Sequence, residues 1–328
     1  KRKLKLPYII AEIGSNNNGS LTKAINLISL AKKSGCDAVK FQSWDENLYD
    51  QKSLNKKELQ KIKKLVMTYE KLKKLRLYAQ SININFGTTV FDTTQLKEAI
   101  KLKCDFIKIA SMDCNNYPLI QEVVKTNQPV IISTGFTTVR ELKKTIEIVN
   151  KTKKKNIYYL HCVSIYPPKL KELNINNIKL LKEITKKNIG FSDHSIGTLA
   201  ATIATSVGAQ IIEKHFTFDK KARGADHEIS ADYHDMRRLA SDCKSVNDIL
   251  GSVKRKISFS EHQISLKMRR SIFAKKKIAK GEIFSDKNIC IHRPGNGLPP
   301  EYLKIIINKK AKRNINEGSK IKLSSVEI

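Results

Sequence analysis

The stretch that decides the fold lies between residues 188 and 230 and contains N-I-G-F-S-D-H-S-I-G (188–197), A-Q-I-I-E-K-H-F-T (209–217) and R-G-A-D-H-E-I-S (223–230). Its apolar runs Ile189–Phe191 and Ile211–Ile212 have the character of buried strands, and each run is followed by polar residues. Ligands of parallel α/β proteins bind beyond the carboxyl ends of the strands, so these polar residues are expected to line a pocket.

The two histidines of this stretch are its first candidate functional residues. His194 and His215 each follow one of the apolar runs, so they are expected to converge at the same end of the sheet. We interpret them as metal ligands or as an acid and a base. Two unrelated histidines, one at a helix N-terminus and one inside the core, are the alternative.

Six more segments with strand character precede this stretch, and helical periodicity follows them. These segments are Tyr8–Gly14, Asp37–Gln42, Ile84–Val90, Phe106–Ser111, Pro129–Gly135 and Ile157–Ser164. Capping signals open two of the helices, Asp92 with Gln95 and Thr138 with Glu141. Eight such units over about 250 residues predict an α/β fold of the (β/α)8 TIM-barrel type. A doubly wound sheet is the structural alternative.

The sequence pattern changes after the barrel. We predict a catalytic barrel domain over residues 1–250, a polar linker over 251–268 and a compact β-rich domain over 269–328. The last segment repeats a short frame with one glycine, I-A-K-G-E-I (278–283) and I-N-E-G-S-K-I (315–321). A module of about 60 residues is near the lower limit for folding alone, so we expect it to dock on another surface.

The chain is strongly basic. Its 328 residues include 62 Lys and Arg against 31 Asp and Glu, a formal net charge of +31. The lysines spread through nearly every predicted helix, and no zinc-finger spacing, RNP-like run or Arg-rich arm accompanies them. We therefore predict no nucleic-acid partner, and we expect the positive field to favour a multiply anionic small substrate.

Cysteine spacing and hydropathy indicate the compartment. The six cysteines are scattered without a C-x-x-C pair, which argues against a zinc knuckle or a disulfide scaffold. No apolar run approaches the ~20 residues that span a bilayer, and no signal peptide is recognised. We expect a reduced, soluble, cytoplasmic protein with no membrane partner.

Polar residues mark the end of every predicted barrel strand. In chain order they are Glu12, Lys40, Gln42, Thr88, Lys108, Ser111, Ser133, Ser164, Ser192, His194, Glu213 and His215. A single Ser or Thr there is readily explained as a helix N-cap. A lysine on an otherwise apolar strand has no comparable explanation. Lys40 and Lys108 with several hydroxyls therefore predict an anion receptor at the barrel mouth.

Several motifs in order resemble the sialic acid (N-acetylneuraminate or nonulosonate) synthase family, which carries a C-terminal antifreeze-like SAF (β-clip) domain. The motifs are A-E-I-G-S-N-N-N-G-S (11–20), V-K-F-Q (39–42), K-I-A-S (108–111), C-N-N-Y-P-L-I (114–120), S-T-G (133–135), H-C-V-S-I-Y-P (161–167), F-S-D-H-S (191–195), E-K-H-F-T (213–217) and R-P-G-N-G (293–297). The likeness covers essentially the whole chain.

The resemblance implies a transferase that condenses phosphoenolpyruvate with an N-acylated hexose, either N-acetylmannosamine or a diacetamido-trideoxyhexose. It implies metal ligands at His194 and His215 for a divalent ion, commonly Mn²⁺, with Mg²⁺ or Co²⁺ as alternatives. The remaining residues that it implies fall into three groups: catalytic Glu12, Lys40, Lys108 and Asp113; phosphoenolpyruvate-binding Lys40, Thr88, Lys108, Ser111, Ser133 and Ser192; and sugar-binding Gln42, Ser164, Tyr166, Asp226 and Arg293.

The resemblance also implies a domain-swapped homodimer, in which Arg293 reaches the sugar site of the partner subunit. Departures from the family pattern include Asn17 in place of a histidine and Ser164 in place of an asparagine. Two alternative functions stay open. One is a phosphoenolpyruvate-dependent aldol-type synthase that acts on a phosphorylated sugar, and the other is a non-catalytic binding protein that uses the SAF domain.

Overall fold

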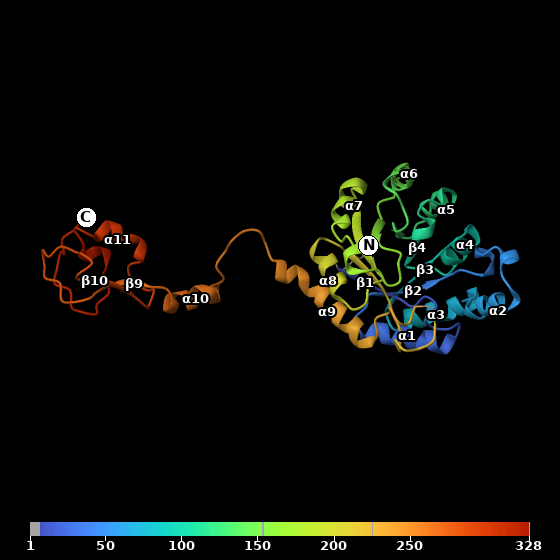
Figure 1. Ribbon diagram of the computed structural model, residues 1–328, viewed down its shortest axis with the longest axis horizontal. Helices are drawn as coiled ribbons and strands as arrows, with labels where there is room; N and C mark the ends of the chain where they lie inside the picture. Colours follow the sequence, from blue (N-terminus) through green and yellow to red (C-terminus); the bar gives the residue numbers. More distant parts are fainter. Residues whose placement is uncertain (1–6, 153, 225, 328) are drawn as a thin grey trace. The chain divides into compact units, whose positions relative to one another are not determined.

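The computed structural model describes residues 7–152, 154–224 and 226–327, and most of the first two ranges form a closed parallel barrel. The barrel strands are β1 (Tyr8–Glu12), β2 (Ala38–Gln42), β3 (Asn85–Thr89), β4 (Phe106–Ile109), β5 (Val130–Ser133), β6 (Ile157–Cys162), β7 (Asn188–Asp193) and β8 (Ile211–His215). Each strand pairs with the next, and β1 pairs with β8. Figure 1 labels β1 to β4 of this barrel. The predicted TIM barrel is confirmed, because a doubly wound sheet would leave β1 and β8 unpaired.

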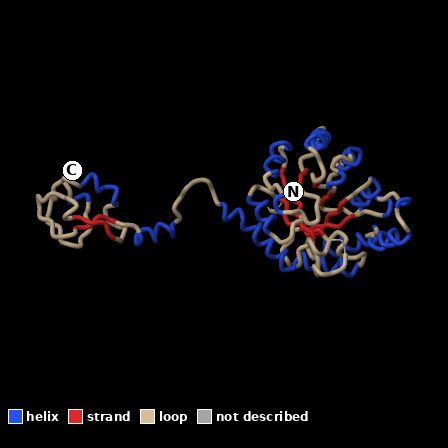
Figure 2. Tube along the Cα trace, viewed as in Figure 1, coloured by secondary structure: helices blue, strands red, loops and turns tan. Residues whose placement is uncertain are grey.

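Helices surround the strands on the outside, as the blue tubes around the red strands in Figure 2 show. They are α1 (Leu21–Lys33), α2 (Lys56–Leu65), α3 (Tyr69–Ser81), α4 (Thr93–Lys101), α5 (Tyr117–Val123), α6 (Val139–Asn150), α7 (Asn177–Thr185), α8 (Leu199–Ser206) and α9 (Tyr233–Leu250). The capping signals act as predicted: the Asp92 side chain accepts from Gln95 N, and Thr138 with Glu141 forms a capping box. Within the described residues, no helix is long and apolar enough to cross a membrane.

The barrel interior changes character along each strand, and this change positions the site. Inward-facing residues near the N-terminal ends are apolar and pack together, for example Ile10, Phe106 and Ile211. Two residues further along the same strands, Glu12 and Lys108 line a cavity at the opposite mouth. Because side chains alternate along a strand, each strand contributes first to an apolar plug and then to a polar basin.

One glycine makes room for the plug. An added Cβ at Gly87 in β3 would lie 2.2 Å from the Phe106 ring on β4. Phe106 is only 3% exposed, so any larger residue at position 87 would displace this ring from the barrel floor. The glycine in the third strand therefore serves packing beneath the basin.

Residues from Ser252 onward form a second compact unit. It contains α10 (Phe259–Met268), β9 (Ser271–Ala274), β10 (Ile289–His292) and α11 (Leu303–Ile306). β9 and β10 pair antiparallel, and isolated bridges such as Ile278 with Ile315 join the two glycine-containing frames. The unit has its own apolar core, which includes Ile272 and Phe284. The segment predicted as a linker, 251–268, contains helix α10 in its second half.

Candidate active site

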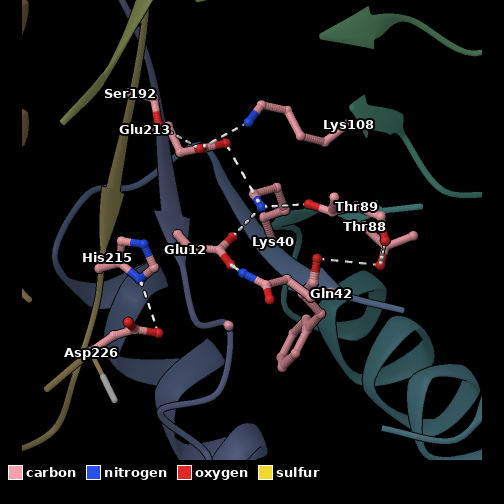
Figure 3. Close-up of polar contacts among 12 residues, drawn as sticks. Glu12, Lys40, Gln42, Thr88, Thr89, Lys108, Ser192, Glu213, His215 and Asp226 are labelled. Atoms are coloured by element: carbon pink, nitrogen blue, oxygen red, sulfur yellow. Dashed lines mark hydrogen bonds and ion pairs between the residues drawn. The ribbon is translucent and has the colours of Figure 1, made fainter. Parts of the chain in front are cut away.

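The basin at the C-terminal mouth of the barrel centres on Lys40 from β2. Its Nζ lies 2.6 Å from Glu12 Oε2 and 3.9 Å from Glu213 Oε2, and it donates to Thr89 Oγ1 at 2.7 Å (Figure 3). Lys108 from β4 reaches the same carboxylate, 3.1 Å from Glu213 Oε1. Four strands therefore bring two lysines and two carboxylates into one buried cluster.

The charges in this cluster control one another. Burial alone would raise the pKa of Glu213, but the Lys108 and Lys40 ammonium groups lower it to about 2. Burial would likewise lower the pKa of Lys40, but Glu12 and Glu213 raise it. Burial lowers the pKa of Lys108, and Glu213 offsets only part of that effect. Glu213 is therefore the ionic partner that both lysines share. For Lys108 this single carboxylate does not fully offset the cost of burying the ammonium group.

Glu12 differs from Glu213 in the direction of its pKa shift. Burial raises the pKa of Glu12, and the neighbouring Glu213 charge raises it further, although Lys40 opposes both effects. Its Oε1 accepts a hydrogen bond from Gln42 Nε2 at 2.8 Å, which fixes the carboxyl plane. A buried carboxyl with a raised pKa is suited to proton transfer near neutral pH.

Hydroxyl groups complete the basin. Ser111, Ser133 and Ser192 line it as predicted, and Ser192 Oγ donates to Glu213 Oε1 at 2.9 Å. Ser133 Oγ is buried and has no hydrogen-bond partner within the described residues. Because a buried hydroxyl without a partner is unfavourable, Ser133 is available to a ligand in the cavity.

Thr88, predicted to bind phosphoenolpyruvate, does not line the cavity. Its side chain faces the outer layer, where Oγ1 lies 2.7 Å from Ser43 Oγ and donates to the Phe41 carbonyl at 3.3 Å. The neighbouring Thr89 lines the cavity (Figure 3). Lys40 pairs with Gly87 in the register, so the inward-facing positions of β3 are 87 and 89. An error of one residue reverses the face of the strand.

The two histidines converge as predicted. The ring centroids of His194 and His215 are 5.4 Å apart, and both rings line the cavity. His194 Nδ1 lies 2.9 Å from the Val163 carbonyl, so this nitrogen carries the proton and Nε2 is left with a free lone pair. Burial lowers the pKa of His215 well below its ordinary value, and the nearby His194 and Lys40 lower it further. His215 is therefore a neutral imidazole, the form that binds metals.

The chemistry of the two histidines is that of metal ligands, since a neutral imidazole binds divalent transition metals. His215 Nδ1 lies 3.8 Å from Asp226 Oδ2 and has no hydrogen-bond partner within the described ranges. The same ranges hold no cluster of three or more His, Cys, Asp or Glu side chains in metal-binding arrangement. The protein ligands offered to a metal are thus two imidazoles, and any further ligands would have to be oxygen atoms of substrate and water.

The predicted sugar-binding residues are partly assembled. Gln42, Ser164 and Tyr166 line the cavity, and the Tyr166 ring stacks on His194 at a centroid distance of 4.1 Å. Asp226 lies beside His215 at the margin (Figure 3). Arg293 is exposed in the second unit, whose position relative to the barrel is not determined. Its prediction as a sugar contact therefore stays a prediction.

The prediction of Asp113 as a catalytic residue is not supported by its position. Asp113 lies in the short 3-10 helix Ser111–Asp113 and does not line the cavity. Its Oδ1 accepts a hydrogen bond from Asn116 Nδ2 at 3.0 Å, so it organises the loop that precedes α5. Asn17 is also occupied locally: its amide donates to Gly14 O at 2.7 Å and accepts from Gly19 N at 2.8 Å.

Among the cavity residues with a polar or thiol side chain, three escaped the sequence analysis as site candidates: Thr89, Cys162 and, as the shared partner of both lysines, Glu213. The sequence pattern identifies Glu213 only as a strand-end residue. The alternation of side chains along a strand identifies Glu213 as a cavity residue, because it lies two residues before His215 on the same face of β8. Cys162 follows from the same rule, since Leu160 two residues earlier belongs to the interior plug.

One part of the rim of the cavity is apolar. Loops after β3 to β6 contribute Phe91, Met112, Phe136 and Tyr166, which we call the apolar arc. Phe136 is 73% exposed and has a φ of 56°, a left-handed conformation that is unusual for a bulky aromatic residue. Such strain persists where a surrounding structure or a ligand requires it.

A (β/α)8 barrel that gathers buried lysines, carboxylates and imidazoles at its C-terminal mouth is a barrel enzyme, because that mouth is where this fold carries its chemistry. Residues 27–255 match the model of the NeuB family, and residues 269–327 match that of the SAF domain. The chain belongs to the NeuB family and carries a SAF domain, as the resemblance predicted.

Relatives match over nearly the whole chain. An uncharacterised protein of Methanocaldococcus jannaschii is 39% identical and covers 94% of this chain and 91% of its own length. The N,N'-diacetyllegionaminic acid synthase of Campylobacter jejuni is 34% identical, with 97% of this chain and 100% of the relative covered. The crystal structure of N-acetylneuraminic acid synthetase from Leptospira borgpetersenii in complex with citrate has a TM-score of 0.74 at 32% identity, covering 79% of this chain and 90% of that chain.

Proposed function

We propose that this protein condenses phosphoenolpyruvate with the aldehyde of an unphosphorylated N-acylated hexose and releases inorganic phosphate and a nonulosonic acid. The observation that carries the proposal is the buried cluster of Lys40, Lys108, Glu12 and Glu213 beside two imidazoles. It combines groups for an anion, for proton transfer and for a carbonyl oxygen in one cavity. Relatives named as legionaminic, pseudaminic and N-acetylneuraminate-9-phosphate synthases support the reaction class.

The anionic substrate is assigned to the base of the basin. Lys108 and Lys40 would bind its phosphate and carboxylate, and Ser111 and Ser133 would donate hydrogen bonds to the oxygens. Ser192 would join them by turning its hydroxyl from Glu213 to the substrate. Lys108 is the stronger candidate for new ionic contacts, because its pKa is lowered by burial and an arriving anion would compensate for that burial. This arrangement would direct C3 of phosphoenolpyruvate toward the aldehyde carbon of the sugar.

Proton transfer is assigned to Glu12. When the C3 carbon bonds to the aldehyde carbon, the former carbonyl oxygen gains a negative charge that takes up a proton. Water then adds to C2, and cleavage of the C2–O bond releases phosphate and leaves the keto group. Glu12, with its raised pKa and its plane fixed by Gln42, would supply the first proton and orient the water for the second step.

His194 and His215 would hold a divalent metal, with Mn²⁺ as the first candidate. When bound there it would act as a Lewis acid on the sugar aldehyde. The neutral state of His215 and the free Nε2 lone pair of His194 support this assignment. Mg²⁺ and Co²⁺ are tested beside Mn²⁺, because two imidazoles alone do not select among these ions.

The rim favours an unphosphorylated acceptor with methyl-bearing groups. Of the described residues that line the cavity, the lysines are Lys40 and Lys108, and both lie in the buried cluster with carboxylate partners. A phosphorylated sugar would need a further cation at the rim. Within the barrel none of the described cavity residues supplies it, so that role would fall to Arg293 of the partner subunit. The apolar arc instead offers contacts to acetamido or deoxy methyl groups, which supports N-acetylmannosamine or a diacetamido-trideoxyhexose.

We also propose that the protein works as a homodimer in which the SAF domain of one subunit covers the barrel mouth of its partner and brings Arg293 to the acceptor. The exposure of Tyr166, Ile196 and Leu199, at 51%, 66% and 68%, supports a covered mouth. Light scattering of the full chain would test the assembly: a dimer is expected, and a monomer that is fully active would contradict the proposal.

Phosphate release tests the reaction directly. We expect release from phosphoenolpyruvate only when Mn²⁺ and an N-acyl hexose are both present. A phosphorylated N-acylmannosamine should be a poor acceptor, and preference for it would favour the rival synthase. No release with any sugar would leave only a binding function.

A further inference from the structure

A second buried ion pair lies behind the two histidines, and the proposed reaction does not use it. Asp193 and Lys214 are direct partners in the register of β7 and β8. Both side chains face away from the cavity, because they alternate with Ser192 and Glu213, which line it. Lys214 Nζ lies 2.9 Å from Asp193 Oδ2, and the side chains of Lys214 and Asp193 are 1% and 0% exposed.

Hydrogen bonds connect this pair to the turn that carries His194. Asp193 Oδ1 accepts from the backbone N and the Oγ of Ser195, at 2.9 Å and 2.7 Å. Lys214 Nζ also donates to the Ser195 carbonyl at 2.6 Å. His194 is the single residue between Asp193 and Ser195, so the pair holds both sides of its turn.

The same pair is attached directly to the second histidine. His215 follows Lys214 at the end of β8. One ammonium group therefore connects the turn that carries the first imidazole to the strand that carries the second. The Val163 carbonyl fixes the ring of His194 from the side of β6, 2.9 Å from its Nδ1. Backbone position and ring orientation are thus fixed by separate contacts.

A buried ion pair is a poor way to gain stability, because removing two charges from water costs about as much as their attraction returns. Its best-supported use is to select one arrangement of the surrounding chain. The contacts of Asp193 and Lys214 run to the flanks of the two histidines and not to a substrate position. Their effect is therefore expected on the spacing of the two rings, now 5.4 Å between centroids.

We propose that Asp193, Lys214 and Ser195 form a positioning network that sets the separation of His194 and His215 and thereby the affinity for the divalent metal. The inference rests on the metal site of the proposed function. The network does not touch the substrate. It acts through the backbone on each side of the two ligands, as residues outside the coordination sphere commonly do.

The test is a double variant, Asp193→Leu with Lys214→Met, which replaces the pair by apolar side chains of similar size. Apolar replacement of both charges is close to neutral for the pair itself, but it leaves the buried N, Oγ and carbonyl of Ser195 without partners, so Tm is expected to fall while the protein stays folded. Binding of Mn²⁺ alone, measured by the loss of the free-ion electron paramagnetic resonance signal, is expected to weaken about 10- to 100-fold. The KM for phosphoenolpyruvate should change little, because Lys40 and Lys108 are untouched.

A milder variant and a matched control complete the experiment. Ser195→Ala removes one hydrogen bond without exposing a charge and should weaken Mn²⁺ binding about fivefold. Asp37→Leu with Lys244→Met removes another partly buried pair, 3.5 Å apart, and should lower Tm without changing Mn²⁺ affinity.

Two results would overturn the inference in different ways. Parent-like Mn²⁺ affinity in a folded Asp193→Leu/Lys214→Met protein, or in Ser195→Ala if the double variant does not fold, would show that the network does not position the ligands. A parent protein that binds no Mn²⁺, with or without phosphoenolpyruvate, would remove the metal site and the inference together.

Discussion

At the scale of single residues, the two carboxyl groups of the basin differ in how strongly the lysines lower their pKa values. Glu213 is kept ionised by two lysines, whereas Glu12 keeps a raised pKa although Lys40 lies 2.6 Å away. Two carboxyl groups in one cavity therefore have different roles. Glu213 holds the lysines, and Glu12 is left to exchange protons.

Glu12→Gln tests this division. The amide keeps the hydrogen bond to Gln42 but loses the proton that the reaction needs. We expect kcat for phosphate release to fall by about 100- to 10,000-fold. This loss should exceed any change in the KM for phosphoenolpyruvate that follows from removing the carboxylate partner of Lys40. A kcat within about threefold of the parent's would assign proton transfer to another group.

The two neighbouring threonines of β3 offer a matched pair. Thr89→Val removes the hydroxyl that accepts a hydrogen bond from Lys40, so the KM for phosphoenolpyruvate should rise about tenfold. Thr88→Val acts on the outer layer through Ser43 and should lower stability by about 1 kcal/mol without changing this KM. Steady-state kinetics and denaturant unfolding of both variants measure the difference, and equal KM effects would contradict the assigned register.

The histidines predict a pH dependence. Burial would lower the pKa of His194, but Cys162 and the Val163 carbonyl raise it above its ordinary value of 6.5. Because a metal needs the neutral ring, Mn²⁺ affinity should be full above that raised pKa and fall as the pH drops through it. Mn²⁺ titrations at pH values between 8 and 5.5 measure this change, because that interval spans the range in which histidines ordinarily titrate. An affinity that is flat over the whole range would remove His194 from the ligand set.

At the scale of elements, the sequence predicts where the strands lie better than it predicts which of their side chains point into the barrel. Apolar runs bounded by polar residues located all eight barrel strands, because a buried parallel strand must be apolar on both faces. The same property hides which residues point inward, and this is why Thr88 was chosen and Thr89 missed. Lys40 and Lys108 were found because a lysine on a buried strand has to be explained by a partner or a ligand.

Residues outside the strands were harder to place. Asp113 follows β4 by four residues, yet a turn of 3-10 helix directs it to Asn116 and away from the cavity. The partnership of Glu213 with both lysines depends on the register of β8, which closes the barrel between distant parts of the chain. Spacing along the sequence does not contain this information.

The second unit leads to a prediction of its own. Arg293 is exposed there, and we propose that it reaches the acceptor of a partner subunit. Arg293→Ala should raise the acceptor KM at least tenfold and leave the KM for phosphoenolpyruvate nearly unchanged. Arg313→Ala, another exposed arginine of the same unit, is the control. Equal effects of Arg293→Ala on both KM values would place the SAF domain elsewhere.

At the scale of the whole molecule, the net charge of +31 produces a long-range electrostatic attraction for anions in addition to the local contacts. Phosphoenolpyruvate is multiply anionic and the proposed acceptor is neutral. A positive protein field should therefore accelerate encounter with the first substrate only, and salt should screen that effect. We expect kcat/KM for phosphoenolpyruvate to fall several-fold between low and physiological ionic strength, while the acceptor value stays nearly constant. Parallel salt dependence for both substrates would contradict this.

The central claim is that the barrel mouth joins two molecules by carbon–carbon bond formation and releases phosphate by cleavage of the C2–O bond. The most direct test uses phosphoenolpyruvate with a heavy oxygen isotope in its bridging position, together with Mn²⁺ and an N-acyl hexose. Mass spectrometry of the products should find the label in inorganic phosphate and the pyruvate carbons in a new nonulosonic acid. Label that remains on the three-carbon unit, or a sugar recovered without added carbons, would contradict the account.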